Sequence, residues 1–334
     1  MGTLQNMIQR DKNLARLLLV FVIIFAICVA LKGSLFLSVS NFQSMGKQFP
    51  EFGLLAIAMA FTLFTAGIDL SVVAVANLCA VLMAKFLVAN AAGADGGSVA
   101  SLILIACVMA LIIGMLCGAL NGLLIGVVGI TPILATLGTQ ALFMGCAIVL
   151  TNGSTLGGLP PQLSASMNSN VAGIPVTILI FVVFAAIAAF IMSQTTLGYK
   201  LRMLGTSVKA STFTGFSNIK LYVYNYMLSG VLSAVAGIIM LGRFNSAKAD
   251  YGASYLMEAI LIAVLGGVDP YGGKGNMSGV IVAIVIVQMV SSWLNMYEGI
   301  SNFYRQIIWG ALLIFVLIYN YVINEREKKK AMKG

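Results

Sequence analysis

Residues 98–127 read SVASLILIACVMALIIGMLCGALNGLLIGV, a stretch without one charged side chain. A helix that crosses the hydrocarbon core of a bilayer needs roughly 20 predominantly apolar residues, so this stretch predicts a membrane span. The rest of the chain is similar: 60% of its 334 residues are hydrophobic, 9% are charged, and the mean hydropathy is +1.02. So little charge leaves no room for a large soluble domain. We therefore predict a multi-pass membrane protein.

Apolar runs of this kind recur along the chain, cut by glycine, proline or charge, and predict about ten spans. The runs lie at about 17–36, 51–68, 71–90, 98–127, 131–150, 173–193, 221–241, 253–268, 277–296 and 304–322. Pro50 is expected to mark the start of the second run. Gly114, Gly118 and Gly122, in GMLCGALNG, are expected to form a small-residue face on which two helices pack closely.

The net charge of +9 gathers in three clusters, near residues 10–16, 200–220 and 326–333. Lys and Arg concentrate in the cytoplasmic loops of membrane proteins. With the N-terminus inside and ten alternating crossings, all three clusters fall on the cytoplasmic side, so the charge reports orientation and does not indicate nucleic-acid binding.

We therefore predict an all-α transmembrane helical bundle with both termini in the cytoplasm. It forms a single membrane domain over 1–334. Within it, 1–16 is a cytoplasmic N-terminal segment, 194–220 a cytoplasmic loop and 323–334 a basic cytoplasmic tail.

The side chains available exclude several kinds of site. The chain has no His, which argues against zinc sites and His-based catalysis. Its five cysteines lie in apolar runs without a CxxC pair and are expected to behave as small buried hydrophobes. The glycine-rich stretch 266–275 has no Ser or Thr after Lys274, so it does not match a phosphate-binding loop. We expect a chain that is not an enzyme and binds no metal or cofactor itself.

Three stretches place polar groups where lipid would penalise them. The first is AGIDLS at 66–71, between the second and third spans. Asp69 in a tight turn would accept hydrogen bonds from backbone N–H groups at the start of the next helix. A role in the solute path or in a gate is the other interpretation.

The other two stretches are predicted to face the cytoplasm. GGVDPYGGKG, at 266–275, has the composition of a specifically shaped turn that cannot be a helix. The loop 196–216 is the longest one inside, and its centre, 206–214, is compatible with a short helix that Gly215 ends. Such a helix would suit binding of a soluble partner, although composition alone fits a solvated loop equally well.

In order and spacing, these stretches resemble the membrane subunits of the ribose, galactose and autoinducer-2 family of bacterial ABC importers. The resemblance covers about residues 50–320. It is carried by AGIDLSVV at 66–73, Asn121-Gly122, Thr136-Leu137-Gly138, Thr151-Asn152-Gly153-Ser154, the cytoplasmic loop, and Ala259-Ile260 with the glycines through Gly275. Departures from the family pattern include Ala66, Val73 and Glu258, where the family has Gly, Gly and Asp. These departures suggest that the chain is one half of a heterodimeric permease pair, although a homodimer is also compatible with the sequence.

The resemblance implies a permease subunit in the bacterial inner membrane that forms a path for a small hydrophilic solute, such as a monosaccharide. The implied partners are a second permease, identical or homologous, an ATPase subunit or tandem ATPase that brings ATP and Mg²⁺, membrane lipid, and a periplasmic or lipid-anchored solute-binding protein. Segment 205–216 would be the helix that couples to the ATPase, through Gly205, Thr206, Ser207, Lys209, Ala210 and Gly215.

Polar residues within or beside the spans are candidates for the translocation path or its gate, although each also has a packing interpretation. They are Asp69, Ser71, Asn77, Asn121, Thr136, Thr139, Gln140, Glu258 and Asp269. Arg243 and Lys248 lie in a predicted outer loop and are candidates for docking the binding protein, because exposed charges steer and orient a partner.

An alternative from another class is an ion-coupled secondary transporter with Asp69 or Glu258 as the proton or sodium carrier. The scarcity of acidic residues in the spans and the absence of His argue against it. A membrane enzyme ranks third, because no nucleophile–base pair can be assembled.

Overall fold

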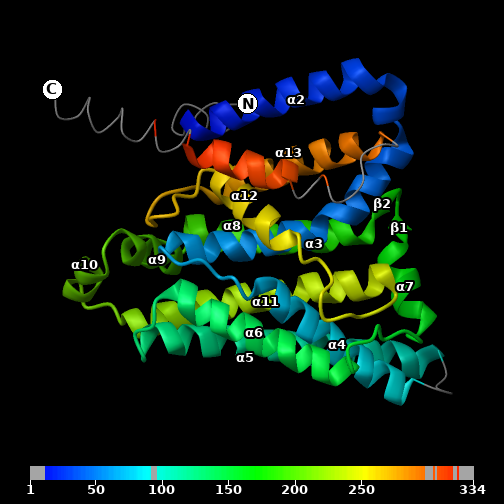
Figure 1. Ribbon diagram of the computed structural model, residues 1–334, viewed down its shortest axis with the longest axis horizontal. Coiled ribbons are helices and arrows are strands. Elements are labelled where there is room, and N and C mark those ends of the chain that lie inside the picture. Colours follow the sequence, from blue (N-terminus) through cyan, green and yellow to red (C-terminus); the bar gives the residue numbers. More distant parts are fainter. Residues whose placement is uncertain (1–11, 92–95, 298–303, 305–306, 319–321, 323–334) are drawn as a thin grey trace.

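The computed structural model describes residues 12–91, 96–297, 304, 307–318 and 322, and the chain within these limits is almost entirely helical (Figure 1). The longer helices are α2 (Lys12–Phe36), α3 (Val39–Phe64), α4 (Val72–Asn90), α5 (Gly96–Gly126), α6 (Pro132–Thr151), α8 (Val176–Gln194), α11 (Asn218–Phe244) and α13 (Met277–Asn295). The shorter ones are α7 (Pro161–Asn168), α9 (Thr196–Thr206), α10 (Val208–Phe213), α12 (Tyr255–Leu265) and an apolar helix over Ile307–Ile318. Strands β1 (Asn170–Val171) and β2 (Ile174–Pro175) form a small antiparallel ribbon in which Asn170 faces Pro175.

Seven helices among the described residues are long and apolar enough to cross a membrane: α2 from Leu14, α4, α5, α6, α8, α11 and α13. The predicted helical membrane fold is therefore confirmed. The remaining predicted spans correspond to α3, α12 and the helix over Ile307–Ile318, which do not meet that combination of length and hydropathy. The count of ten crossings stays a prediction. The predicted basic tail at 323–334 and most of the segment 1–16 lie outside the described residues.

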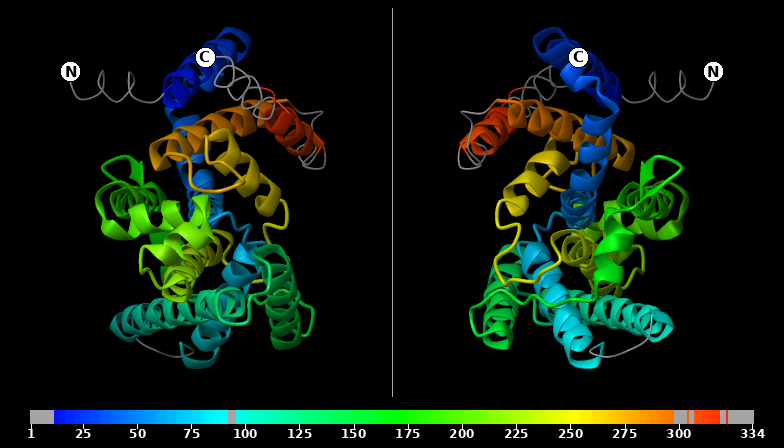
Figure 2. Two further views of the ribbon diagram at one scale, coloured as in Figure 1. Left: turned by 90° about the vertical axis from the view of Figure 1, so that its left-hand side faces the viewer. Right: turned by 90° about the vertical axis from the view of Figure 1, so that its right-hand side faces the viewer.

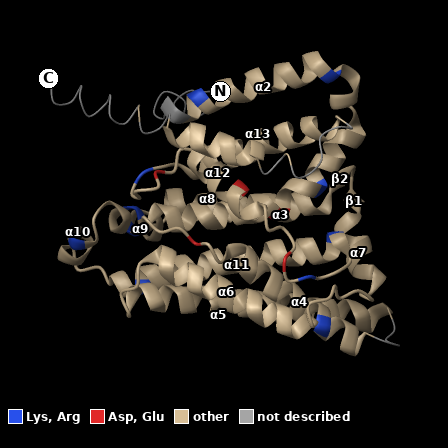
Figure 3. Ribbon diagram, viewed as in Figure 1, with Lys and Arg blue, Asp and Glu red and all other residues tan. Residues whose placement is uncertain are grey.

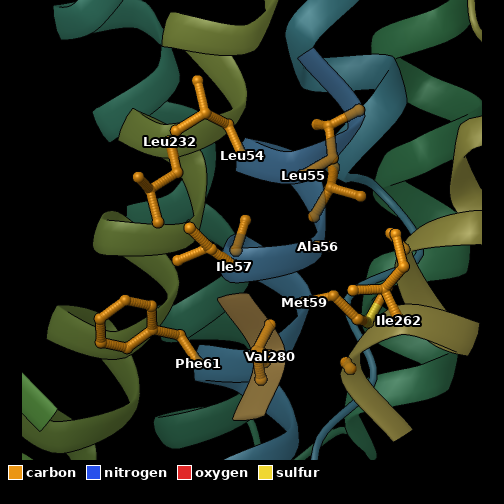
Figure 4. Packing of buried hydrophobic residues seen from close by; sticks show 14 of the residues in the cluster. Leu54, Leu55, Ala56, Ile57, Met59, Phe61, Leu232, Ile262 and Val280 are labelled. Atoms are coloured by element: carbon orange, nitrogen blue, oxygen red, sulfur yellow. The ribbon is translucent and has the colours of Figure 1, made fainter. Parts of the chain in front are cut away.

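Helix α3 forms the centre of the bundle. Every residue from Pro50 to Phe64 is buried, and Figure 4 shows Leu55, Ile57 and Met59 of α3 among side chains of α11, α12 and α13. Figure 2 shows α2 at one end of the assembly and α5 with α6 at the other, with α3 between them. Helices α2, α5, α6 and α8 expose most of their apolar residues, as expected where the surrounding solvent is lipid.

The prediction that Pro50 starts a helix is wrong, because α3 begins at Val39 and Pro50 lies within it. Ser38 caps this helix by accepting a hydrogen bond from the Asn41 N–H at 3.2 Å. The capping residue Ser38, which was not predicted, therefore sets the start of α3, and Pro50 lies within the helix.

The predicted glycine face on α5 is confirmed as a packing device. Helix α5 crosses α11 so closely that a Cβ at Gly114, Gly118 or Gly122 would collide with the backbone of α11, at Gly230, Tyr226 and Val223 respectively. Only small residues allow two helix backbones to approach in this way.

Irregular backbone interrupts the helical structure at two places, which we call breaks. The segment 65–71 separates α3 from α4, and 245–254 separates α11 from α12, which is only 11 residues long. Figure 1 shows α12 beginning well inside the bundle instead of at its edge. Irregular backbone is tolerated at membrane depth only where protein or a water-filled cavity surrounds it, so both breaks need polar partners.

Candidate transport site and cytoplasmic junction

The first break is held by the carboxylate of Asp69, which is only 2% exposed. Its Oδ1 accepts hydrogen bonds from the Ser71 N–H at 3.0 Å and the Ser71 hydroxyl at 2.6 Å. Its Oδ2 accepts one from the Ser229 hydroxyl on α11 at 2.8 Å. The predicted acceptance of a backbone N–H by Asp69 is confirmed. The carboxylate thus joins the start of α4 to α11.

The network continues from Ser71 into two further helices. The Asn121 Nδ2 on α5 donates to the Ser71 Oγ at 2.8 Å, and the Thr139 hydroxyl on α6 donates to the Asn121 Oδ1 at 2.6 Å. Thr136 accepts a hydrogen bond from the Leu70 N–H at 3.1 Å and lies 2.9 Å from the Ile68 carbonyl. The structure therefore brings together five of the predicted residues in one buried network, which we call the Asp69 network: Asp69, Ser71, Asn121, Thr136 and Thr139, joined by Ser229.

The second break is held by Asn77, one of the remaining predicted residues. Its Nδ2 lies 2.9 Å from both the Ala249 and the Tyr251 carbonyl oxygens, so it satisfies the irregular backbone that leads into α12. Glu258 lies in the first turn of α12 and is 8% exposed. Asn77 and Glu258 thus belong to the α12 break and not to the Asp69 network.

Asp269 lies in neither place. It is in the loop 266–276 between α12 and α13, where its Oδ1 accepts a hydrogen bond from the Tyr271 N–H at 3.0 Å. Its side chain closes a turn of this loop, which we call the glycine loop.

Arg243 has an internal partner, which argues against the hypothesis that it docks a binding protein. Its Nη2 lies 3.1 Å from the Oε1 of Glu51 on α3, and its Nη1 donates to the Lys47 carbonyl at 3.1 Å. The Tyr255 hydroxyl at the start of α12 donates to the same Glu51 oxygen at 2.5 Å. Glu51 is fully buried. These three residues, the outer cluster, join α3, α11 and α12.

Glu51, Tyr255 and Ser229 were not among the residues predicted from the sequence. An acidic residue directly after a proline in an apolar run was the available signal for Glu51, but its partners lie far away in the sequence. Lys248, the other docking candidate, is partly exposed and pairs with the exposed Asp250 at 3.0 Å.

A short helix, α10, lies within the segment 205–216 for which coupling to an ATPase is predicted. Ser207 caps it by accepting a hydrogen bond from the Ala210 N–H at 3.2 Å, and Gly215 follows it with a φ of +79°. Asn218 ties the helix to α11, because its Oδ1 accepts from the Ser211 hydroxyl at 2.6 Å. Lys209 and Ala210 are exposed. The helix was predicted over 206–214, and it proves to be preceded by α9, which the sequence did not indicate as separate.

All three polar stretches meet at the end of α3. Gly205, at the end of α9, packs so closely that a Cβ there would collide with the Phe64 carbonyl oxygen. The Gly273 N–H of the glycine loop donates to that same oxygen at 3.0 Å. A Cβ at Gly272 would lie 2.8 Å from the Gly205 carbonyl oxygen. We call residues 64–66, 205–206 and 272–273 the cytoplasmic junction.

Arg202 adds a side chain to this junction, with its guanidinium 5.5 Å from the centroid of the Phe64 ring. This distance is within the range of a cation–π contact. The junction leads directly into 65–71, and so connects α9 and α10 to the Asp69 network.

Comparison with known proteins assigns a family. Residues 41–317 match the family described as "Branched-chain amino acid transport system / permease component". The autoinducer 2 import system permease protein LsrD of Photorhabdus luminescens is 31% identical over 312 residues, which cover 92% of this chain and 89% of that protein. The protein of the same name from Yersinia pseudotuberculosis serotype O:1b is 30% identical over 336 residues, covering 96% of each. No solved structure matches the chain at a comparable level of significance.

Proposed function

Because the chain belongs to the branched-chain amino acid transport system permease family, and is thus a permease subunit of an ABC importer in the inner membrane, we propose that it passes a small hydrophilic, sugar-like solute. The import of autoinducer 2 by the relatives supports a solute of this class. Family membership favours ATP-driven import over the ion-coupled alternative. The hydrogen bonds of Asp69 also favour ATP-driven import over ion coupling. Three donors already engage its carboxylate, which an ion carrier would need to offer to the ion.

The ATP is hydrolysed by a partner ATPase, which supplies the Mg²⁺ site as well. The ATPase binds the segment 205–216 of this chain. The segment then transmits the movement of the ATPase through the cytoplasmic junction. The observation that carries this proposal is the close backbone contact between Gly205 and the Phe64 carbonyl, five residues before Asp69. Because no flexible side chain separates the two backbones, a displacement of α9 and α10 would be passed to the turn at 65–71.

Within the bundle, we assign the gate to the Asp69 network and the path to the α12 break. In the network, Asp69, Ser71, Asn121 and Thr136 hold the start of α4 in place. At the break, Asn77 and Glu258 lie beside irregular backbone, the arrangement from which membrane transporters build solute sites.

The remaining partners are a second permease, identical or homologous, and an external solute-binding protein. Lys248 is the docking candidate that stays exposed, since Arg243 is engaged with Glu51. The whole chain over 1–334 acts as one membrane domain in this proposal.

The test is uptake into vesicles that contain the purified importer, made by co-expression of this chain with its ATPase and second permease. We expect uptake of a radiolabelled sugar-like solute to require ATP on the cytoplasmic face and an added binding protein. Uptake by this chain alone, driven by an imposed ion gradient, would contradict the proposal and make Asp69 and Glu258 the residues to substitute.

A further inference from the structure

The two most exposed large hydrophobic or aromatic side chains among the described residues are Phe213, 90% exposed, and Tyr271, 83% exposed. Many of the others lie on membrane-spanning helices, where lipid covers them. Phe213 ends α10, and Tyr271 lies in the glycine loop, so both are outside the spanning helices and at the same end of the molecule (Figure 1). Exposed aromatic side chains outside the lipid region are typical of protein–protein contact sites.

The turn that presents Tyr271 is held by three hydrogen bonds. The Tyr271 N–H donates to the Asp269 Oδ1 at 3.0 Å, and the Gly272 N–H donates to the Asp269 carbonyl at 2.9 Å. The Asp269 N–H donates to the Lys274 carbonyl at 3.1 Å. A side chain on a backbone that is already fixed loses little further conformational entropy when a partner covers it.

The glycine loop also has a fixed position relative to the proposed coupling segment. Gly272 approaches the Gly205 carbonyl, and a Cβ at Gly273 would collide with the Thr206 hydroxyl. The Gly273 N–H holds the loop to the end of α3 as well. The loop that carries Tyr271 therefore packs against residues 205–206, which lead directly into α10.

The segments that meet here carry more basic than acidic residues, and Figure 3 shows Lys and Arg along α9, α10 and the glycine loop. The segments 196–220 and 266–276 carry Lys200, Arg202, Lys209, Lys220 and Lys274, and their acidic residue is Asp269. The Asp269 Oδ1 is already engaged by the Tyr271 N–H. The partner that fits these segments has an apolar pocket with acidic side chains around it.

We propose that Tyr271 is a second anchor for the ATPase subunit of the importer, which binds the glycine loop together with α10. This inference rests on the proposed coupling through 205–216, since it assigns a further contact to the same partner. The ATPase would then contact both segments that meet at Gly205, and its movement would reach the cytoplasmic junction from two directions.

The experiment uses the complete importer in vesicles, with single substitutions Y271C, F213C and Y224C labelled by a benzophenone maleimide. Tyr224, 51% exposed on the membrane-spanning helix α11, is the matched control. The unsubstituted chain, with its five native cysteines, gives the background. After illumination, we expect adducts with the ATPase from positions 271 and 213, and adducts with phospholipid from position 224.

The outcomes separate the two proposals. An ATPase adduct from position 213 with only phospholipid adducts from position 271 would overturn the second anchor and identify Tyr271 as a lipid-interface residue, leaving the coupling proposal in place. The absence of ATPase adducts from both positions would overturn the coupling proposal itself.

A second measurement tests how strongly Tyr271 contributes to binding of the ATPase. Truncation of an aromatic anchor at an interface should lower the affinity for the ATPase about thirtyfold or more, which corresponds to roughly 2 kcal/mol, so we expect this loss for Y271A and none for Y224A. Retention of the cognate ATPase on the affinity-tagged permease during dilution reports this difference. Equal retention by Y271A and Y224A would contradict the proposal.

Discussion

The outer cluster and the cytoplasmic junction both hold α3 to distant parts of the chain, but they do so by different physical means. At the outer cluster, Glu51 meets Arg243 and Tyr255 through long side chains and one buried carboxylate oxygen. At the junction, backbones meet at Gly205, Gly272 and Gly273. Side chains can separate by rotating, whereas contacting backbones must move together. The difference suggests an outer end that can open and a cytoplasmic end that transmits movement as one body.

The largest expected effect comes from breaking the outer pair. Arg243→Leu leaves Glu51 buried without its cation, and removing one partner of a buried ion pair costs about 3–5 kcal/mol. We expect a clear fall in the thermal unfolding midpoint of the permease in detergent. The double substitution E51Q with R243L removes both charges and should recover most of the loss. If R243L proves as stable as the unsubstituted chain, the pair contributes nothing to stability.

A smaller effect is expected at the Asp69 network, into which the junction leads. Asp69→Ala removes the acceptor of three hydrogen bonds. At about 0.5–1.5 kcal/mol for each of the three bonds, the loss should be about 1.5–4.5 kcal/mol. The exposed Asp250 is the matched control, and D250A should leave the unfolding midpoint nearly unchanged. Equal midpoints for D69A and D250A would show that the network does not hold the start of α4.

The smallest effect is expected at Lys248, a partly exposed cation of the outer side. Its pair with Asp250 is exposed to solvent, and such pairs contribute about 0–1 kcal/mol. K248A should therefore leave stability unchanged while slowing association with the binding protein, most clearly at low ionic strength. Stopped-flow association rates at two salt concentrations measure this. A rate that equals that of the unsubstituted chain at both concentrations would remove Lys248 from the docking surface.

Features encoded within a few neighbouring residues could be predicted from the sequence. The spacing of Gly114, Gly118 and Gly122 predicts a packing face, and the turn around Asp69 predicts an accepted backbone N–H; both are confirmed. Helix α10 likewise follows from local composition and from Gly215.

Features that depend on distant partners could not be predicted. The pairing of Arg243 with Glu51 is one example, because Glu51 lies on another helix far away in the sequence. The meeting of Gly205, Gly272 and Phe64 is likewise a property of the fold, and no pattern in any one stretch indicates it.

In the proposed mechanism, the cytoplasmic junction transmits the movement of the ATPase to the solute path. The number of solute molecules imported per ATP hydrolysed tests this transmission most directly. Gly205→Ala places a methyl group against the Phe64 carbonyl, whereas Gly138→Ala on α6 meets open space and serves as the control. We predict that the G205A importer hydrolyses ATP but imports severalfold less solute per ATP, with G138A unchanged. A G205A importer whose ratio equals that of G138A would contradict the account.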